Sequence, residues 1–380
     1  MINEQAIPLL TPMLPNIEAL TPYLERIDKN QYYSNFGPLC QELESRLASR
    51  FSEKGQQSLN VVTVSSCTLG LELLLQSLNL PLKSHVLIPA LTFVATFTAI
   101  IKSGYTPVVC DVDPDNWMLT PELIDNFITP DIKAVIAVAT FGQPQDTIKW
   151  SQFQNKTGIK VIIDAAAGFG SQWVHTPDIP VAYSMHATKS LAAGEGGFIV
   201  TGSAIIANFI KETSNFGINL SGLTDYPVGY LSNIGTNAKL SEYHAAVGLA
   251  SLDSWEYQCS LRQSVYSVYR SKLDDNCGNK LTWQSGIRPI CPTTLSIRLG
   301  STERRNALEK LCATLRIGTR RWYQPLLHQH APQLGPYINQ PLPIAEAISS
   351  DSVGIPFSAF LTDAQIQRVV NAIRTVISNT

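Results

Sequence analysis

The sequence is poor in charged residues and contains no block of one charge sign and no long apolar run. Asp, Glu, Lys and Arg make up 15% of the 380 residues, and the formal net charge is −2. Soluble domains usually contain about 25% charged residues. Because no basic block is present, we expect neither nucleic acid nor an anionic membrane surface as a partner. No window approaches the roughly 18 uninterrupted apolar residues of a membrane-spanning helix, so we expect no such helix.

Targeting features and paired cysteine spacings are also missing. No Lys or Arg precedes the apolar residues of the first 20 positions, which include prolines, so we expect neither a signal peptide nor a transit peptide. The seven cysteines are scattered and form no C-x-x-C pair. We interpret them as free buried thiols of a cytoplasmic protein without a metal site. The glycine run after residue 193 does not match G-x-G-x-x-G and does not indicate a dinucleotide site.

Hydrophobic residues are abundant, at 44%, and their arrangement predicts an α/β fold. Short apolar runs alternate with helical stretches, and the runs are continuous, as in strands that are buried on both faces. We expect strands at Val61–Val64, Val86–Ile88, Pro107–Cys110, Ala134–Ala139, Lys160–Ile163, Val181–Met185 and Phe198–Thr201, with helices at Thr68–Leu78, Thr92–Lys102 and Thr147–Lys156. This order predicts a largely parallel sheet, in which ligands bind at the carboxyl ends of the strands.

The chain length and a change of pattern near residue 250 predict two domains. We expect an N-terminal arm over residues 1–40, a large α/β domain over 41–250 and a small C-terminal α+β domain over 251–380. A long helical stretch near Leu240–Leu273 leads into the small domain. The small domain then continues with a strand at Thr294–Leu299, a helix at Thr302–Leu315 and a last helix at Thr362–Ile377.

Two of the predicted strands are followed by residues that suit a phosphate or a flat ring. The segment Ser65-Ser66-Cys67-Thr68 opens a helix, and the free N–H groups and dipole of a helix N-terminus favour a phosphate. A simple N-terminal cap is the alternative, and taken alone it is the better interpretation. Phe93 lies just after another strand, where it could stack on a ring or simply belong to the core.

Two further strands end near groups that suit a cofactor. Asp164 ends one strand, and an ionised carboxylate at a buried strand end is costly unless it is paired, for example with a pyridinium nitrogen. A helix-capping role is an equal alternative. Lys189 follows another strand, among small residues, where burial would lower its pKa as an imine-forming amine requires. A solvated loop lysine is the alternative. Only the combination and order of the four segments indicate a cofactor site.

The segments SSCTLGL, TFVAT, IIDAAAGFGS and YSMHATKSLAAGEGG resemble successive signature blocks of the DegT/DnrJ/EryC1/StrS family, as do GTNAKLSEYHAAVGLASL and PLPIAEAISSDSVGIPFSAFLT. The resemblance extends from about residue 35 to the C-terminus. It implies fold type I of the transferases that depend on pyridoxal 5′-phosphate (PLP), with a mixed, mainly parallel sheet in the large domain. It also implies an aminotransferase that moves an amino group from an amino acid, L-glutamate, to a keto-deoxysugar linked to a nucleotide, dTDP for example.

The resemblance implies roles for individual residues. Lys189 would hold PLP as a Schiff base and act as nucleophile and general acid/base, and Asp164 would pair with the ring nitrogen. The other implied cofactor contacts are Phe93 on the ring, Ala167 near the ring hydroxyl, Ser184 and the amides of Cys67 and Thr68 at the phosphate, and Asn237 at the phosphate of the partner in a homodimer with shared sites. Candidate substrate residues are His186, Arg320, Arg321, Trp322, Tyr323 and His328.

Three positions depart from the family pattern. Ala167 replaces the usual Gln or His, so the contact to the ring hydroxyl is missing from its expected place. Cys67 replaces a glycine and adopts positive φ angles less readily. Lys239 replaces an arginine and lacks its bidentate fork. The family's sugar-nucleotide dehydratases carry His in place of the lysine, so Lys189 argues against that activity.

Several alternatives stay open at the level of sequence. A PLP-dependent sugar-nucleotide dehydratase and a non-catalytic binding or regulatory protein are the competing functions. His186 could be a structural residue, Arg320 and Arg321 could form an exposed basic turn, and Asn237 could cap the helix near Leu240. The sugar, the nucleotide and the aminated carbon, 3 or 4, are not specified. The implied pathway makes amino sugars for a cell-surface polysaccharide, such as lipopolysaccharide, or for a secondary metabolite.

Overall fold

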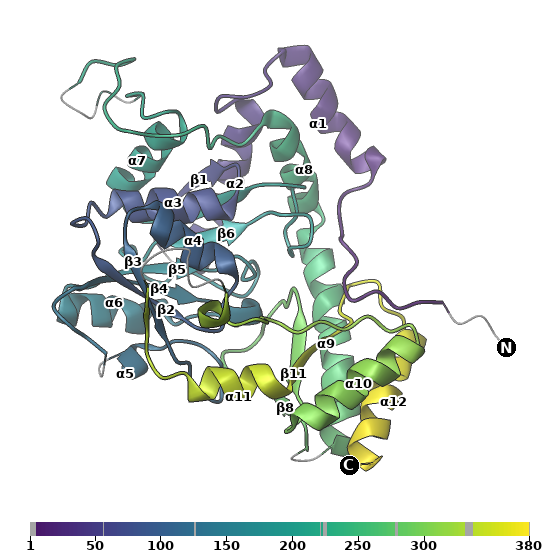
Figure 1. Cartoon of the computed structure of the whole chain (residues 1–380). Coiled ribbons are helices and arrows are strands. Elements are labelled where there is room, and N and C mark those ends of the chain that lie inside the picture. Colours follow the sequence, from purple (N-terminus) through teal and green to yellow (C-terminus); the bar gives the residue numbers. More distant parts are fainter. Residues whose placement is uncertain are drawn as a thin grey trace.

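The structure is a computed structural model that describes residues 5–379, apart from 56, 125–126, 221, 223–225, 278–279 and 331–336. A large α/β body carries a smaller sheet-and-helix unit, and the long helix α9 runs from one to the other (Figure 1). Along the described residues, no helix combines the length and the apolar character needed to cross a bilayer.

The described residues place eight strands in the large sheet, in the order β1-β7-β6-β5-β4-β2-β3-β10. These strands are β1 (Asn60–Val64), β2 (His85–Pro89), β3 (Thr106–Cys110), β4 (Ile132–Val138), β5 (Lys160–Asp164), β6 (Val181–Ser184), β7 (Gly197–Thr201) and β10 (Ile338–Asn339). Strand β7 runs antiparallel to both of its neighbours, and the other pairs are parallel. All seven strands predicted for the large domain are present in this sheet, whereas β10 was not predicted.

Helices cover both faces of this sheet, which explains why its strands are continuous apolar runs. The helices of the large body are α2 (Pro38–Gly55), α3 (Cys67–Ser77), α4 (Val94–Lys102), α5 (Pro121–Ile124), α6 (Thr147–Thr157), α7 (Ala204–Ser214), α8 (Glu242–Asp253) and α11 (Pro343–Asp351), with short 3-10 turns at Thr140–Gly142 and Leu327–Gln329. One core cluster joins the sheet to α2, α6 and α8, and the other joins it to α3, α4, α7 and α11. Neighbouring residues alternate between the clusters: Val161 and Ile163 face the first, and Ile162 faces the second.

The predicted single helical stretch over residues 240–273 is wrong, because it consists of two helices. Ser241 caps α8 by accepting a hydrogen bond from the His244 amide at 3.3 Å. Helix α9 (Trp255–Cys277) follows after Ser254, whose φ of −96° and ψ of 5° leave the helical range. The break turns Trp255 into the core, where its ring lies 4.5 Å from that of Phe169, centroid to centroid.

The smaller unit is built on a second sheet, ordered β11-β9-β8 and antiparallel throughout the described residues. Its strands are β8 (Thr282–Trp283), β9 (Leu295–Arg298) and β11 (Ser352–Ile355). They pack with α9, α10 (Thr302–Thr314) and α12 (Asp363–Asn379) around a third apolar cluster. The sequence predicted β9, α10 and α12 but missed β8 and β11. The chain returns to the large sheet before β11: β10 is a strand of that sheet, and α11 packs in its second core cluster.

The segment expected to be an arm contributes to two cores. Ile7 bridges to Ile317 and is buried in the cluster of the small sheet. Helix α1 (Ile17–Asn30) follows, and its one buried side chain, Ile27, packs in the cluster that contains α2 and α8. The rest of α1 stands at the edge of the molecule (Figure 1).

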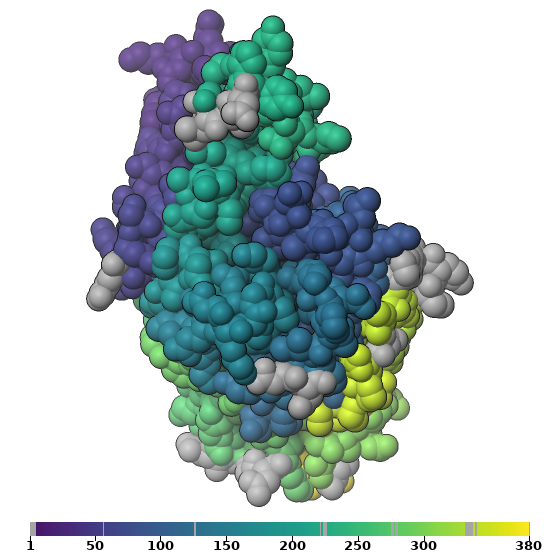
Figure 2. Space-filling model, turned by 90° about the vertical axis from the view of Figure 1, so that its left-hand side faces the viewer, coloured from purple at the N-terminus to yellow at the C-terminus, as the bar shows by residue number. Residues whose placement is uncertain are grey.

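A second segment projects from the body near α7 (Figure 1); we call the described residues of 216–236, that is 216–220, 222 and 226–236, the projecting arm. Figure 2 shows residues of this part of the chain at the same end of the molecule as α1. Ile218 bridges to Leu231 and Asn215 to Asn237, so the projecting arm is folded back on itself. Its exposed side chains include Phe216, Tyr226, Val228, Tyr230, Leu231 and Ile234.

Candidate active site

A cavity of about 450 Å³ lies where β1, β2, β4, β5 and β6 end. The carboxyl ends of parallel strands meet at one edge of a sheet, and this is where such folds bind ligands. Thr293 and Thr294, which come directly before β9 of the smaller unit, and the segment from Arg320 to Tyr323 close the cavity from the other side. The site is therefore shared between the large sheet and the smaller unit.

Asp164 lies at the bottom of the cavity, at the end of β5, and is 5% exposed. Its Oδ2 accepts a hydrogen bond from Thr96 Oγ1 at 2.8 Å, and its Oδ1 accepts one from the Ala166 amide at 3.0 Å. Burial raises the pKa of the Asp164 carboxyl, while these two hydrogen bonds and the nearby positive charge of Lys189 oppose the rise. A cation bound against Asp164 would offset the cost of burying its charge.

Lys189 comes from the turn that follows β6, and its backbone amide donates to the His186 carbonyl at 2.8 Å. Its amine lines the same cavity as Asp164. Burial lowers the pKa of Lys189, and the nearby Cys67 and Asp164 oppose that shift. An amine with a lowered pKa is more often neutral near pH 7, which nucleophilic attack on an aldehyde requires.

The N-terminus of α3 forms one end of the cavity. Ser66 caps this helix by accepting from the Leu69 amide at 3.2 Å, and within the described chain the amides of Cys67 and Thr68 have no hydrogen-bond partner. Free amides at a helix N-terminus favour a phosphate. Ser184 borders the same end, with its Oγ accepting from the His186 amide at 3.2 Å. Gly197 permits this packing, because a Cβ there would lie 2.5 Å from the Cys67 nitrogen.

Aromatic rings form the opposite wall. The ring of Tyr323 stacks on that of Phe141, with centroids 5.4 Å apart and planes 17° apart. Phe93 precedes α4 and is 57% exposed, so it is not a core residue, and its ring lies 6.2 Å from that of Tyr323. Burial, with a smaller contribution from Asp164, raises the pKa of the Tyr323 hydroxyl. The Arg320 guanidinium lies 4.6 Å from the centre of the Trp322 ring.

Ala167 and His186 line the cavity as well. The Ala167 carbonyl accepts from Thr293 Oγ1 at 3.2 Å, so a hydroxyl from the smaller unit stands beside the position where the family carries Gln or His. The Thr188 amide donates to His186 Nδ1 at 3.2 Å, and His186 Nε2 lies 3.6 Å from Glu195 Oε1. Because Nδ1 accepts, the neutral ring carries its proton on Nε2, directed at Glu195.

Three predicted residues do not reach the cavity in this chain. Arg321 is held by Glu309 through bonds of 2.8 and 2.6 Å. His328 Nε2 lies 3.2 Å from Glu346 Oε1. Asn237 lies at the base of the projecting arm, where its Oδ1 accepts from Lys239 Nζ at 2.8 Å. Asn237 does not cap α8 either, because Ser241 does.

Other lining residues were not singled out from the sequence: Leu10, Thr92, Glu195 and Thr293. Thr96 also had no predicted role, although its hydroxyl holds Asp164. Thr96 is a hydroxyl residue in the first turn of α4, the helix after β2, and β2 ends at the same edge of the sheet as β5. That position was a usable signal for Thr96. Leu10 and Thr293 gave no such signal, because only tertiary packing brings them to the cavity.

The cavity therefore combines a buried carboxylate, an amine of lowered pKa, an aromatic wall and a helix N-terminus with free amides. These groups fit the pyridinium, the aldehyde, the ring and the phosphate of PLP, so the site is that of a PLP-dependent enzyme. Residues 16–374 match the model of the DegT/DnrJ/EryC1/StrS aminotransferase family. The chain belongs to this family, and the predicted family, fold class, aminotransferase activity and PLP cofactor are confirmed.

Individual relatives agree with this assignment. The chain is 29% identical to the dTDP-4-amino-4,6-dideoxy-D-glucose transaminase of Shigella dysenteriae, over 98% of this chain and 100% of the relative. It is similar to the crystal structure of DesI, determined in the presence of its TDP-sugar product, with 28% identity and a TM-score of 0.85 over 99% of this chain and 94% of DesI. NtdA from Bacillus subtilis, solved with bound PMP, shares the fold, with 23% identity and a TM-score of 0.87 over 100% of this chain and 87% of NtdA.

Proposed function

We propose that this enzyme transfers the amino group of an amino acid, L-glutamate, to the keto group of a deoxysugar linked to a nucleotide. The observation that carries the proposal is the meeting of Asp164 and Lys189 in one cavity beside free amides at the N-terminus of α3. Two relatives, the Shigella transaminase and DesI, are named for a dTDP-sugar and a TDP-sugar. They support a dTDP-linked sugar as the acceptor, and the name of the Shigella relative favours a 4-keto-6-deoxy sugar over a 3-keto sugar.

PLP, when bound, supplies an electron sink for the electrons released from the substrate Cα–H bond. Asp164 would keep the ring nitrogen protonated, because a charge-assisted hydrogen bond to a buried carboxylate is strong. Thr96 and the Ala166 amide each hold one carboxylate oxygen and so fix the plane of the carboxylate. The amides of Cys67 and Thr68, with the Ser184 hydroxyl, would hold the phosphate.

Lys189 would do two tasks in sequence. Its neutral amine would hold the cofactor aldehyde, and after substrate displaces it the same amine would carry a proton away from the substrate Cα. Its lowered pKa serves both tasks, because each needs the unprotonated amine. The reverse sequence with a keto sugar would deliver the amino group to the sugar carbon.

The wall opposite the sheet would bind the sugar nucleotide. Arg320 supplies a positive charge for a diphosphate, and Trp322 and Tyr323 supply flat surfaces for the base or the sugar. Phe93, at the mouth, would stack on the cofactor ring. Of the two arginines in this turn, only Arg320 lines the cavity, since Arg321 is paired with Glu309.

We also infer a homodimer with shared sites. The projecting arm exposes Tyr226, Tyr230, Leu231 and Ile234, each by more than half. Large apolar side chains exposed together on one segment are typical of a protein–protein interface. A two-fold axis would place the projecting arm of one subunit at the site of the other and bring Asn237 to the partner's phosphate end.

Complementation between variants tests the dimer. When Asn237→Ala and Lys189→Ala chains are mixed and exchange, one site of each heterodimer carries neither lesion if Asn237 serves the partner. Activity should then rise towards roughly a quarter of wild type for statistical exchange. No rise on mixing, or an active monomer in sedimentation at assay concentration, would contradict the shared site.

The remaining inference concerns the location of the enzyme and the pathway that it serves. We propose a cytoplasmic enzyme that makes amino sugars for a cell-surface polysaccharide, such as lipopolysaccharide, or for a secondary metabolite. The aminotransferase family and the sugar relatives support this role. A dehydratase remains the competing reaction on the same substrates, and the retained Lys189 argues against it.

The decisive experiment measures both half-reactions. Holoenzyme mixed with L-glutamate should lose its visible cofactor absorption and release one equivalent of 2-oxoglutarate per site. A panel of dTDP-, UDP- and GDP-linked keto sugars should then restore the absorption, with an amino sugar as product. Lys189→Ala is the control. Water elimination from a panel member without release of 2-oxoglutarate would replace this proposal with the dehydratase.

A further inference from the structure

Two threonine hydroxyls form a hydrogen-bonded row that ends on Asp164. Thr92 follows β2, and Thr96 lies in the first turn of α4. Thr96 Oγ1 is 2.8 Å from Asp164 Oδ2 and 3.0 Å from Thr92 Oγ1. The exposed fractions of Thr92, Thr96 and Asp164 are 2%, 0% and 5%. Thr92 and Asp164 line the active-site cavity, and Thr96 joins them from behind its wall.

The orientation of the Thr96 side chain differs from that of other threonines in helices. A helical threonine commonly donates to the carbonyl of the residue four positions earlier. Several threonines of this protein do so, at 2.7–3.1 Å: Thr21, Thr157, Thr213, Thr314 and Thr375. Thr96 donates instead to a carboxylate 68 positions away, and it contacts the hydroxyl of Thr92, the residue four positions earlier. The orientation of Thr96 therefore follows from these two partners and not from the helix.

The chemistry of the three groups fixes the direction of the row. An ionised carboxylate only accepts hydrogen bonds, and a hydroxyl has a single proton to donate. Thr96 donates its proton to Asp164, so the Thr96 oxygen accepts in the contact with Thr92, and the Thr92 hydroxyl is the donor. Both protons point along the row towards Asp164. A proton on Asp164 Oδ2 would reverse this order, so the row in this direction matches the ionised carboxylate.

The hydrogen bond from Thr96 matters because Asp164 is buried. Burial raises the pKa of the Asp164 carboxyl, and the Thr96 hydroxyl makes the largest opposing contribution, ahead of the Ala166 amide and the charge of Lys189. Among the described residues, Asp164 accepts no other side-chain hydrogen bond than that of Thr96. The strength of this one bond therefore bears directly on the charge of Asp164.

Thr92 can strengthen that bond without touching Asp164. In a water-free interior, hydrogen bonds in a row polarise one another, so a donor to the Thr96 oxygen makes the Thr96 hydroxyl a better donor. The other titratable groups beside Asp164, Cys67 and Tyr323, are uncharged near pH 7, because burial raises the pKa of each. They do not take over the part of the row.

We propose that Thr92 is a positioning residue for transamination: by donating to Thr96, it strengthens the hydrogen bond that keeps Asp164 ionised, so that the proton between Asp164 and bound PLP stays on the ring nitrogen. The effect of Thr92 on the reaction rate rests on the function proposed above. Its effect on the ring nitrogen requires only bound cofactor and no substrate.

The test measures the nitrogen-15 resonance of the ring in holoenzyme reconstituted with PLP labelled at that nitrogen. Wild type should show a protonated ring nitrogen. Thr92→Val keeps the shape and removes the hydroxyl, so the resonance should move towards that of an unprotonated pyridine, by less than in Thr96→Val. Thr92→Ala carries the same expectation, and Thr92→Ser, which restores a hydroxyl, should return the resonance to the wild-type position.

Thr98→Val is the matched control. Thr98 lies on the same helix and is half-buried, but its hydroxyl donates to the Ala95 carbonyl at 3.1 Å. Loss of this hydroxyl should leave the ring-nitrogen resonance unchanged. A shift in Thr98→Val as large as that in Thr92→Val would mean that the resonance reports only a disturbance of α4, and it would overturn the proposal.

A double-mutant cycle tests whether Thr92 acts through Thr96. In the Thr96→Val background, Thr92→Val should cause no further shift, because the bond that it strengthens is gone. Thr92→Val alone should slow the glutamate half-reaction by about two- to fivefold. An unmoved resonance in Thr92→Val, or equal shifts in both backgrounds, would overturn the role of Thr92 even in an active transaminase. Failure of the keto-sugar panel would refute the proposed acceptor and leave this measurement unaffected.

Discussion

The two walls of the active-site cavity are held in place in different ways. The sheet wall consists of Asp164, Ser184, Lys189 and the N-terminus of α3, which lie at the ends of buried strands or directly after them. The opposite wall consists of Arg320, Trp322 and Tyr323, in a turn of the smaller unit held by aromatic contacts and the backbone bridge from Arg320 to Gly354. The sheet therefore holds the groups proposed for the chemistry, and the smaller unit holds the groups proposed for the substrate.

The largest effect is expected from Lys189→Ala in the sheet wall. Removal of the amine takes away both the attachment of the cofactor and the proton carrier, so transamination should fall by about 10⁴-fold or more. The fold should persist, because a cavity-lining side chain is removed. Steady-state rates and thermal unfolding measure the two effects. Borohydride reduction and peptide mapping of wild type should locate the cofactor on Lys189, and a label on another lysine would contradict the assignment.

Asp164→Asn comes next, because it keeps the shape of the side chain and removes its charge. The ring nitrogen would lose a charge-assisted hydrogen bond, and we expect the glutamate half-reaction to slow by roughly 10²–10³-fold with cofactor still bound. Stopped-flow absorption measures this rate. Thr96→Val, which removes one hydrogen bond to the same carboxylate, should cost about tenfold or less. Near-normal kinetics of Asp164→Asn would refute its role.

The opposite wall should respond in substrate binding and not in the first half-reaction. Arg320→Gln should raise KM for the keto-sugar nucleotide by about tenfold, since a charge-assisted contact to phosphate is lost. The rate with L-glutamate should stay within about twofold of wild type, because that half-reaction needs no contact to a nucleotide phosphate. Arg321→Gln is the matched control one residue away, and it should leave KM unchanged. Equal effects of both variants would mean that the turn acts only through its net charge.

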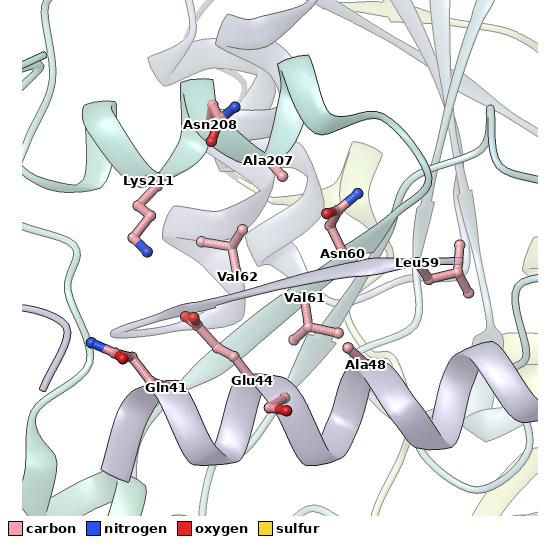
Figure 3. A pocket seen from close by; sticks show the side chains of 11 residues that line it. Gln41, Glu44, Ala48, Leu59, Asn60, Val61, Val62, Ala207, Asn208 and Lys211 are labelled. Atoms are coloured by element: carbon pink, nitrogen blue, oxygen red, sulfur yellow. The ribbon is translucent and has the colours of Figure 1, made fainter. Parts of the chain in front are cut away.

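The smallest effect is expected from Glu44, which supports β1 close to the sheet wall of the cavity, and it concerns the stability of the fold. Glu44 on α2 accepts hydrogen bonds from the Thr63 amide and hydroxyl, both at 2.8 Å. Glu44 also lines a second cavity of about 330 Å³, and Lys211 lines the same cavity from α7 (Figure 3). Thr63 lies shortly before the N-terminus of α3. Glu44→Ala should lower the free energy of unfolding by about 1–3 kcal/mol, because the Thr63 amide loses its acceptor. Glu44→Gln keeps an acceptor and should cost less.

The same pair of variants has a defined pH dependence. Burial raises the pKa of Glu44 above its unfolded value, against the opposing Thr63 hydrogen bonds and Lys211. Between the pKa of Glu44 in the unfolded state and its higher pKa in the folded state, the folded state binds more protons. The contribution of Glu44 to stability therefore declines as the pH rises through this range. Glu44→Gln does not titrate there, so its stability relative to wild type should increase over the same range. Denaturant unfolding at several pH values measures the trend, and parallel curves would contradict it.

The sheet wall was largely predictable from the sequence. Continuous apolar runs located seven strands, and the residues that follow them, Asp164 and Lys189, could be assigned to one sheet edge from the strand pattern alone. The opposite wall was harder to predict. The basic turn offered Arg320 and Arg321 equally, and only the position of Glu309 shows which one is free for the cavity. His328 is held by Glu346 in the same way, from α11.

Long-range packing explains the other differences. The helix break at Ser254 depends on a pocket for Trp255 in the core. This break leaves no periodic signal in the sequence. Thr293 reaches Ala167 from the segment before β9, so a residue pattern around Asp164 alone could not show that a hydroxyl stands near the replaced Gln or His.

The first residues of the described chain have a practical consequence for handling this enzyme. Ile7 exchanges backbone hydrogen bonds with Arg316 and Gly318, the Leu9 carbonyl accepts from the Phe357 amide, and Leu10 lines the active-site cavity. An affinity tag fused ahead of residue 1 would thus be joined to a segment that enters the substrate cavity within ten residues. A tag at the other end would follow α12, which packs on the small sheet, and is the better choice for kinetic work.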